Sequence, residues 1–149
     1  NVRQLAQRKA RAVSAQAESS ALVIAADTIV VCDGTILGKP QDEADAVRML
    51  RMLSGRTHQV MTAVCVKTAD AECAEVSVTD VTFRTLHDGE AEAYAASGEP
   101  LDKAGAYGIQ ERGALLVEGI QGDYFNVVGL PVCLVGQLLA RFGVDPFLI

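Results

Sequence analysis

The chain has 149 residues and a mass of 15.7 kDa; half of its residues are hydrophobic and 21% are charged. This composition is typical of one globular domain and excludes a disordered chain. Nineteen acidic residues against thirteen Lys and Arg give a net charge of −6, which argues against a protein that coats nucleic acid. No stretch approaches the roughly 18 apolar residues of a membrane-spanning helix.

The first part of the chain predicts a helix followed by a hairpin. Good helix formers predict a helix over 2–17, which Ser19-Ser20 would end. The β-branched, apolar run 21–32 predicts a buried strand. Asp33-Gly34 is a strong signal for a tight turn into a short returning strand over 35–37.

The middle of the chain predicts a helix and two long strands. Apolar residues at helical spacing predict a helix over 42–53, with Asp42 as its N-cap. The runs 57–68 and 76–86 predict strands separated by a polar turn. Broken alternation in the second run predicts a bulge near Thr79-Asp80.

The last part of the chain mixes loop, strand and helix. Asp88 is expected to cap a short helix ending at residue 96, and the Gly-rich segment 98–113 is expected to be mostly loop. A strand is predicted over 114–120, and a final helix from Pro131 to about residue 142. Hairpins mixed with helices predict an α/β or α+β fold with a mixed, twisted sheet.

Asp27 is the most informative residue, because it interrupts an apolar strand. A buried, unpaired carboxylate is costly, so Asp27 is expected at the rim of a cleft, beside a cation or metal, or solvated at a strand end. Lys39 follows across the hairpin between Gly38 and Pro40. The returning chain is expected to bring Lys39 near Asp27, the alternative being a solvated turn lysine.

The Gly-rich segment 98–110 is a second candidate site. It offers backbone N–H groups, the positive charge of Lys103 and the amide of Gln110, whereas a plain surface loop is the alternative reading. It lacks the glycine fingerprints of P-loop and dinucleotide-binding proteins. His58 and His87 are isolated from any nucleophile, so we expect them to be packed or solvated.

The cysteines show no metal-binding pattern. They form no CxxC pair and have no His at ligand spacing, so we expect small, buried, reduced side chains in a cytoplasmic protein, at Cys32, Cys65, Cys73 and Cys133. No signal peptide is apparent, and the chain starts with Asn1 rather than Met. We therefore expect a piece of a longer protein.

Several segments, in order along almost the whole chain, together resemble the Maf family of nucleoside triphosphate pyrophosphatases. They are ADTIVV at 26–31, ILGKP at 36–40, ML at 49–50 with LSG at 53–55, THQVMTAV at 57–64, VTFR at 81–84, SGEP at 97–100, DKAGAYGIQ at 102–110 and NVVGLP at 126–131. The Ala-Asp-Thr at 26–28 resembles the branch of the family that hydrolyses dTTP and UTP.

The resemblance implies hydrolysis of a nucleoside triphosphate to the monophosphate and pyrophosphate. It implies that Asp27 is the proton acceptor and a ligand of Mg²⁺ or Mn²⁺, and that Thr28 and Gln110 set the base preference. It also implies substrate-binding lysines around the triphosphate, at Lys9, Lys39 and Lys103. A non-catalytic, nucleotide-binding regulator of cell division is the alternative, and a partner-binding domain without nucleotide is a second one.

The same resemblance implies one Maf-like domain over 1–149, with an elongated mixed sheet flanked by helices and a cleft between two lobes. A homodimer is expected, and neither nucleic acid nor a membrane is expected as a partner. The family's first strand and its Ser-x-Ser-Pro-Arg-Arg loop have no counterpart here. Glu111 also follows Gln110 where the family usually has Gly. We therefore expect weaker activity than in intact members.

Overall fold

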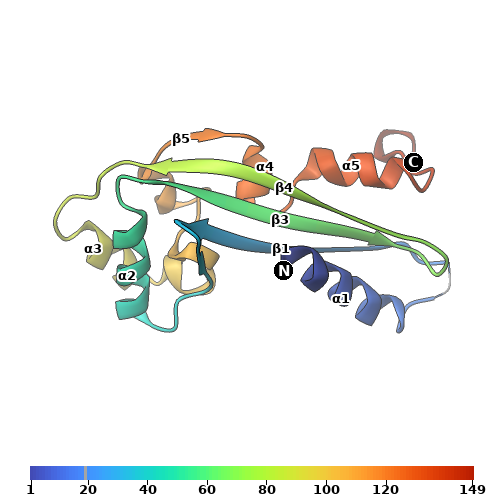
Figure 1. Ribbon diagram of the computed structural model, residues 1–149, viewed down its shortest axis with the longest axis horizontal. Helices are drawn as coiled ribbons and strands as arrows, with labels where there is room; N and C mark the ends of the chain where they lie inside the picture. The colour runs from blue at the N-terminus through green and yellow to red at the C-terminus, as the bar shows by residue number, and fades with distance from the viewer. Residues whose placement is uncertain (19) are drawn as a thin grey trace. The chain divides into compact units, whose positions relative to one another are not determined.

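The structure, a computed structural model, describes residues 1–18 and 20–149 (Figure 1). The helices and strands are α1 (Val2–Ser14), β1 (Val23–Cys32), β2 (Thr35–Leu37), α2 (Glu43–Leu53), β3 (Thr57–Lys67), β4 (Glu72–Phe83), α3 (Glu90–Ala96), β5 (Val117–Gln121), α4 (Tyr124–Val128) and α5 (Val132–Ala140). Short 3-10 segments are η1 (Glu99–Asp102), η2 (Ala104–Ala106), η3 (Arg112–Leu115) and η4 (Pro146–Leu148).

The strands form one five-stranded sheet in the order β2-β1-β3-β4-β5. Strand β2 returns along β1 through the Asp33-Gly34 turn, with Val30 opposite Leu37, and β4 pairs antiparallel with β5 although α3 and three 3-10 segments lie between them in the chain. The predicted α/β fold is confirmed, with antiparallel strands in place of a mixed sheet. Short hairpin connections account for the pairs β1–β2 and β3–β4, because parallel neighbours need long crossovers.

The described residues divide into two compact units. The first unit comprises Asn1–Thr28, Met61–Ser77 and Phe125–Ile149, and the second comprises Ile29–Val60 and Val78–Tyr124. Strands β1, β3 and β4 contribute residues to both units. Each unit has its own core, described in turn below.

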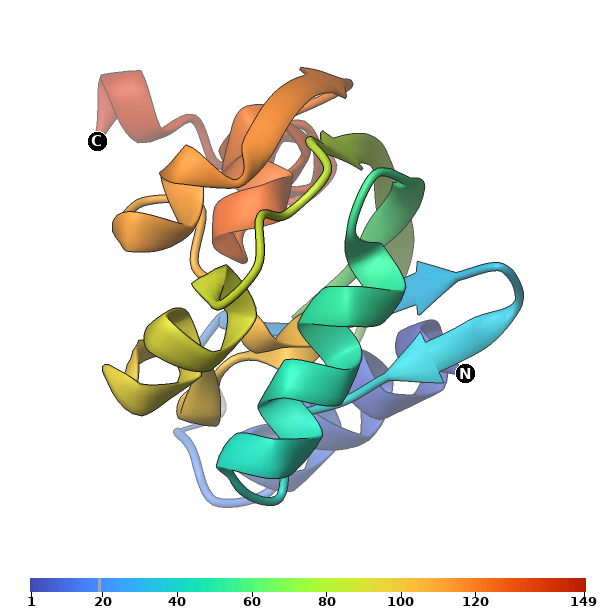
Figure 2. The ribbon, with the colours of Figure 1, turned by 90° about the vertical axis from the view of Figure 1, so that its left-hand side faces the viewer.

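In the first unit, α1 and α5 cover opposite faces of the strands (Figures 1 and 2). The α1 side buries Val2, Ala6 and Ala10. On the other face, helix α5 packs against the inward residues of β3, in a cluster of Val64, Val66, Val135, Leu138 and Leu139. Helix α1 ends at Ser14 instead of the predicted residue 17. Ser19, which the sequence predicts at its end, lies outside the described residues.

In the second unit, α2 and α3 lie side by side beside the β1–β2 hairpin (Figure 2). Asp42 is the N-cap of α2, as predicted: its carboxylate accepts from the amide of Asp45 at 2.7 Å. The predicted cap of α3 is wrong by one residue, because Gly89 occupies that position with φ +83°. A residue with positive φ is most easily glycine.

Three expectations for β4 and the loops are corrected. Strand β4 keeps its alternation through Thr79, Val81 and Phe83, all buried; polar Thr79 takes an inward position and donates to the Asp123 carbonyl at 2.9 Å. The register irregularity with β5 lies between Thr82 and Phe83 instead. The segment 98–113 folds largely into 3-10 turns, and residues 114–115 belong to η3 rather than to β5.

The cysteines are more varied than expected. Cys32 and Cys65 are buried, Cys73 is half-buried and Cys133 is exposed, and all four are free thiols. The expectation of burial is therefore wrong for Cys133, which lies at the solvent side of α5. Within the part of the chain that the structure describes, no helix has both the length and the apolar character needed to cross a membrane.

Candidate active site

Asp27 lies on β1 and is paired with a lysine. Its carboxylate Oδ1 is 2.5 Å from Nζ of Lys9, which extends from α1, and the same Nζ lies 3.4 Å from the carbonyl oxygen of Ala26. The Asp27 side chain is 19% exposed, so it is partly shielded yet open to a ligand. Of the alternatives that the sequence left open, the structure shows the carboxylate beside a cation, with Lys9 as that cation.

Thr28, the next residue, makes its contact on the opposite face of β1. Successive side chains of a strand alternate between the two faces of a sheet. The Thr28 hydroxyl is 2.8 Å from the hydroxyl of Thr62, on β3. Strand β2 pairs with β1 only from Val30 onward, so the edge of β1 before Val30 has no partner in the sheet order.

Lys39 and Lys103 are brought together within the second unit. The amide of Gly105 donates to the carbonyl of Gly38 at 3.1 Å, which ties the two lysine-bearing loops to each other. Hydrogen bonding from Lys103, at 3.0 Å, lowers the pKa of Asp102, and the positive charge of Lys39 adds to this effect. Both ammonium groups therefore act on one carboxylate. Lys39 is exposed, and its predicted approach to Asp27 stays a prediction.

The loop that carries Lys103 and Gln110 is held by close backbone contacts rather than being a loose surface loop. Gly105 has φ +73°, and a Cβ there would lie 2.9 Å from a methyl carbon of Val30. At Gly108, a Cβ would lie 2.6 Å from Cε of Lys103, so the lysine stem crosses directly over this glycine. Gln110 itself is exposed.

Glu99 ties the two ends of this loop together. Its carboxylate accepts from the amides of Arg112 and Gly113, both at 3.1 Å, and from the hydroxyl of Tyr94. Partial burial opposes ionisation of Glu99, but these hydrogen bonds outweigh it and lower its pKa. The carboxylate is thus a structural acceptor that keeps the loop closed.

His58 contacts the same loop through Tyr107. It is fully buried, its Nε2 is 2.7 Å from the hydroxyl of Tyr107, and both rings pack edge-on against Phe83. Burial lowers the pKa of His58 to about 4, so the ring is neutral at physiological pH. The expectation that the two histidines are packed or solvated is confirmed, because His58 is packed and His87 is 81% exposed.

The described residues of the second unit line cavities of about 720, 470 and 340 Å³. One of about 720 Å³ is lined by Ser97, Gly98, Glu99, Asp102, Lys103, Glu111 and Arg112. In it, the Glu111 carboxylate is 3.5 Å from Nζ of Lys103, so the departure from the family's usual Gly places a negative charge beside a candidate phosphate ligand.

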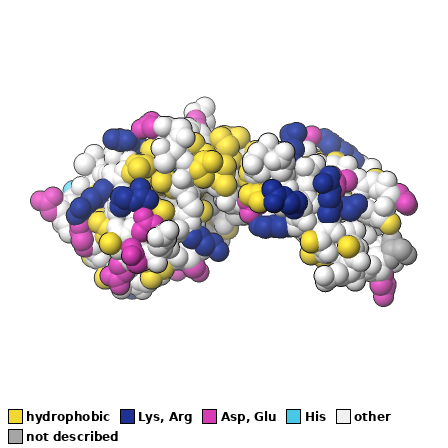
Figure 3. Space-filling model, turned by 60° about the horizontal axis from the view of Figure 1, so that its bottom comes forward, with side chains coloured by type: hydrophobic (Ala, Val, Ile, Leu, Met, Phe, Trp, Pro, Cys, Tyr) yellow, Lys and Arg dark blue, Asp and Glu magenta, His cyan; other side chains and the backbone are white. Residues whose placement is uncertain are grey.

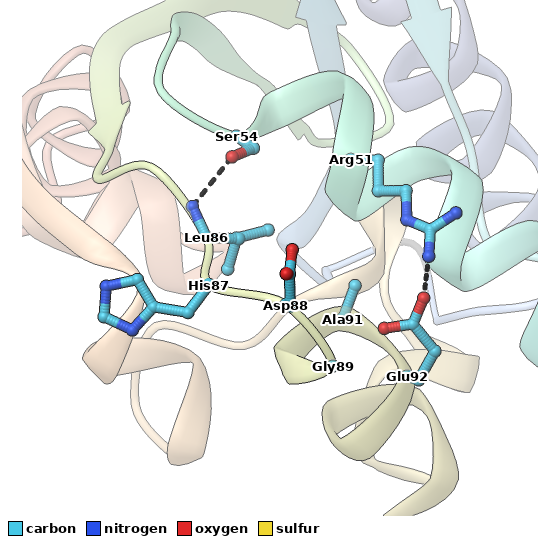
Figure 4. A pocket seen from close by; sticks show the side chains of 8 residues that line it. All are labelled: Arg51, Ser54, Leu86, His87, Asp88, Gly89, Ala91 and Glu92. Carbon is cyan, nitrogen blue, oxygen red and sulfur yellow. Dashed lines mark hydrogen bonds and ion pairs between the residues drawn. The ribbon is translucent and has the colours of Figure 1, made fainter.

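The cavity of about 340 Å³ contains none of the predicted site residues, and neither does the cavity of about 470 Å³, which Figure 4 shows. Figure 4 shows Arg51 paired with Glu92 and the Ser54 hydroxyl accepting from the amide of Leu86 at 2.8 Å. Its mixed charges neutralise one another, which makes it a weaker candidate for a polyanion than the cavity that contains Lys103.

A metal ion would have a single predicted carboxylate ligand. In residues 1–18 and 20–149, no group of three or more His, Cys, Asp or Glu side chains could hold a metal ion. Asp27 nevertheless fits the way Mg²⁺ binds with phosphates, which takes one or two carboxylates and completes its shell with phosphate oxygens and water. The donor set therefore fits a metal that arrives with a triphosphate.

The surface charge also differs between elements. Helix α1 carries Arg3, Arg8, Lys9 and Arg11 and no acidic residue. Figure 3 shows basic side chains gathered on this face over the region of α1, whereas acidic and basic side chains are interspersed over the region of α2 and α3. Two of these cations are ion-paired with β4, Arg3 with Glu75 and Arg11 with Glu72, so the positive charge of α1 is partly neutralised.

Thr62 is the residue that the analysis of the sequence missed. It is fully buried and contacts Thr28, a predicted base-reading residue. Its signal was present in the alternation of β3, where inward Val60, Val64 and Val66 flank one polar residue. A polar side chain in an apolar stripe needs a hydrogen-bond partner and therefore marks a specific contact.

The comparisons with known proteins identify the family of the chain. The model of the family described as Maf-like protein matches residues 1–142. The dTTP/UTP pyrophosphatase of Moorella thermoacetica is 61% identical over 146 residues, which are 97% of this chain and 75% of that protein. Proteins of the same name from Syntrophomonas wolfei and Bacillus pumilus are 55% and 50% identical, over 95% and 99% of this chain and 75% and 77% of their own lengths. The chain belongs to the Maf family.

Proposed function

We propose that the chain hydrolyses dTTP and UTP to the nucleoside monophosphate and pyrophosphate. The observation that carries the proposal is the match to relatives named dTTP/UTP pyrophosphatase along 95% or more of the chain, at 50–61% identity. The Lys9–Asp27 pair on β1 and the paired lysine loops support it, because they supply the acid–base group and the charge that this reaction needs.

The lysines of the second unit are assigned to the phosphates. A triphosphate is a polyanion, and a chain of net charge −6 must counter it locally. Lys39 and Lys103 are the groups that stabilise the charge that develops on pyrophosphate as it leaves. The hydrogen bond from the Gly105 amide to the Gly38 carbonyl holds the two loops that carry these lysines next to each other.

Asp27 is assigned to the attacking water. The water oxygen forms a bond to the α-phosphorus, the bond from that phosphorus to the bridging oxygen breaks, and Asp27 accepts the proton that the water loses. The ion pair with Lys9 holds the carboxylate in one orientation. A divalent cation bound with the substrate supplies further charge neutralisation, and Asp27 is the residue that would hold it.

The remaining expectations belong to the same proposal. Thr28 and Gln110 are assigned to the base, and Lys9, besides orienting Asp27, to the phosphate side of the substrate. A homodimer in the cytoplasm, with neither nucleic acid nor a membrane as partner, completes the proposal.

Two variants test the proposal by pyrophosphate release from dTTP and UTP with Mg²⁺. Asp27→Asn removes the proton acceptor with little change in volume, so turnover is expected to fall by about a hundredfold or more. Lys39→Ala is expected to lower turnover with no loss of thermal stability, because an exposed turn lysine contributes little packing. Asp70→Asn, the same chemical change in the exposed turn after β3, is the matched control.

The outcomes separate the alternatives. Equal turnover in the wild type and in Asp27→Asn contradicts the assigned role of Asp27. Binding of dTTP with no pyrophosphate release from any variant favours the nucleotide-binding regulator over the enzyme. Binding is measured as a rise in the thermal midpoint, since a ligand of the native state must stabilise it.

A further inference from the structure

The hydroxyl of Thr62 links Thr28 to the main chain of α4. Thr62 is fully buried, its oxygen lies 2.8 Å from the Thr28 hydroxyl, and it lies 3.3 Å from the main-chain carbonyl oxygen of Asn126. All three residues belong to the first unit. The three oxygens therefore form a short hydrogen-bonded chain that ends at a partly exposed residue of β1.

The direction of these hydrogen bonds follows from their last member. A carbonyl oxygen only accepts, so the single proton of the Thr62 hydroxyl is donated to Asn126. The Thr62 oxygen then accepts the proton of Thr28. With its only proton committed, the Thr28 hydroxyl retains only lone pairs, and it meets a ligand as a hydrogen-bond acceptor.

We propose that Thr62 is a positioning residue that fixes Thr28 as an acceptor and thereby sets the preference for uracil and thymine over cytosine. Uracil and thymine carry a proton on ring nitrogen N3, whereas N3 of cytosine is an acceptor at neutral pH. A Thr28 hydroxyl that acts as an acceptor forms a hydrogen bond with the N3 proton of uracil or thymine. With cytosine, the hydroxyl oxygen and N3 are both acceptors, so no hydrogen bond forms. A site that hydrogen-bonds a substrate N–H rejects an analogue that lacks it, because buried polar groups then stay unpaired.

This inference rests on the proposed function, since it assumes that Thr28 contacts the base. It adds a buried residue that does not touch the substrate, and a definite donor–acceptor direction. It also accounts for a buried polar residue in the apolar stripe of β3, because a buried hydroxyl needs a hydrogen-bond partner.

Thr62→Val is the test, because valine keeps the shape and removes the hydroxyl. The Thr28 proton is then free to turn outward and pair with N3 of cytosine. The ratio of kcat/KM for UTP to that for CTP is expected to fall by about tenfold or more, mainly through KM. Thr62→Ser keeps the hydroxyl and is expected to restore the ratio, whatever the stability of either variant. Thr28→Val removes the acceptor. It is expected to lower kcat/KM for UTP without raising kcat/KM for CTP.

A second measurement keeps this inference separable from the proposed function. Dissociation constants are measured by calorimetry for UTP and CTP analogues whose α,β-bridge is a methylene. Binding with the expected ratio but without pyrophosphate release from UTP overturns the enzymatic proposal and leaves the role of Thr62 standing. Pyrophosphate release with an unchanged UTP to CTP ratio in Thr62→Val overturns the role of Thr62. No binding of either analogue overturns both.

Discussion

Arg84 and Glu90 form a half-buried, bidentate ion pair in the second unit. Two guanidinium nitrogens donate to the two carboxylate oxygens at 2.8 and 2.7 Å, and the amide of His87 donates to the same carboxylate at 2.5 Å. The Arg84 hydrogen bonds, followed by the His87 amide, lower the pKa of Glu90 to about 2. This one residue therefore connects the end of β4 to the start of α3.

The lowered pKa of Glu90 predicts a defined pH dependence. A carboxyl group with a depressed pKa in the folded state stabilises the fold above its ordinary pKa of 4.5, and this contribution is lost as the pH falls toward 2. The urea midpoint of Glu90→Gln is thus expected to lie below that of the wild type near neutral pH, and the difference is expected to vanish near pH 2. Glu118→Gln, an exposed carboxylate of β5, is the control. A difference that does not change with pH would contradict the ion pair.

At the scale of elements, the loop from Lys103 to Gln110 depends on two glycines for different reasons. At Gly105, both the backbone conformation and the contact with Val30 exclude a side chain. At Gly108, no positive φ is involved, and the crowding atoms belong to the flexible stem of Lys103. One glycine therefore maintains the fold of the loop, and the other maintains the path of a lysine.

Substitution by alanine is expected to affect stability at one glycine and substrate binding at the other. Gly105→Ala is expected to cost about 1–3 kcal/mol of unfolding free energy, because strain and steric overlap add. Gly108→Ala is expected to change stability by less than about 1 kcal/mol but to raise KM for dTTP, since Lys103 must move. Urea denaturation and steady-state kinetics on both variants measure this. If Gly108→Ala is the less stable of the two and binds dTTP normally, the assignment is wrong.

Elements set by local rules were predictable, and contacts between distant segments were not. The Asp33-Gly34 turn and the Asp42 cap follow from two or three adjacent residues, and the structure confirms both. The 3-10 turns of the Gly-rich loop are held by Glu99, Tyr94 and Gly38, whose approach no local pattern encodes. The Lys9–Asp27 and Thr62–Thr28 contacts likewise join residues 18 and 34 positions apart.

At the scale of the molecule, three strands belong to two units at once. Strands β1, β3 and β4 each contribute residues to the first and to the second unit, whereas β2 and β5 lie wholly in the second. Each unit nevertheless has its own buried side chains, Leu138 in the first and Leu50 in the second. Loss of either core therefore removes the packing that orders the shared strands.

Shared strands predict one cooperative unfolding transition. Leu138→Ala and Leu50→Ala are each expected to lower the unfolding free energy by about 2–5 kcal/mol, the usual cost of truncating a buried leucine. Both are expected to move the same single transition in urea, followed by circular dichroism and by tyrosine fluorescence. Leu115→Ala, at a residue 73% exposed, is expected to leave it in place. Two transitions, each moved by one variant only, would show that the units unfold independently.

The alternation of β1 has a consequence for how new enzymes arise from this fold. Asp27 meets Lys9 on one side of the strand, and Thr28 meets Thr62 on the other. If bond cleavage depends on the first side and nucleobase choice on the second, mutations can accumulate on the second side while the reaction stays intact. A duplicated gene then acquires a different nucleotide specificity through a few substitutions around Thr62, without an inactive intermediate.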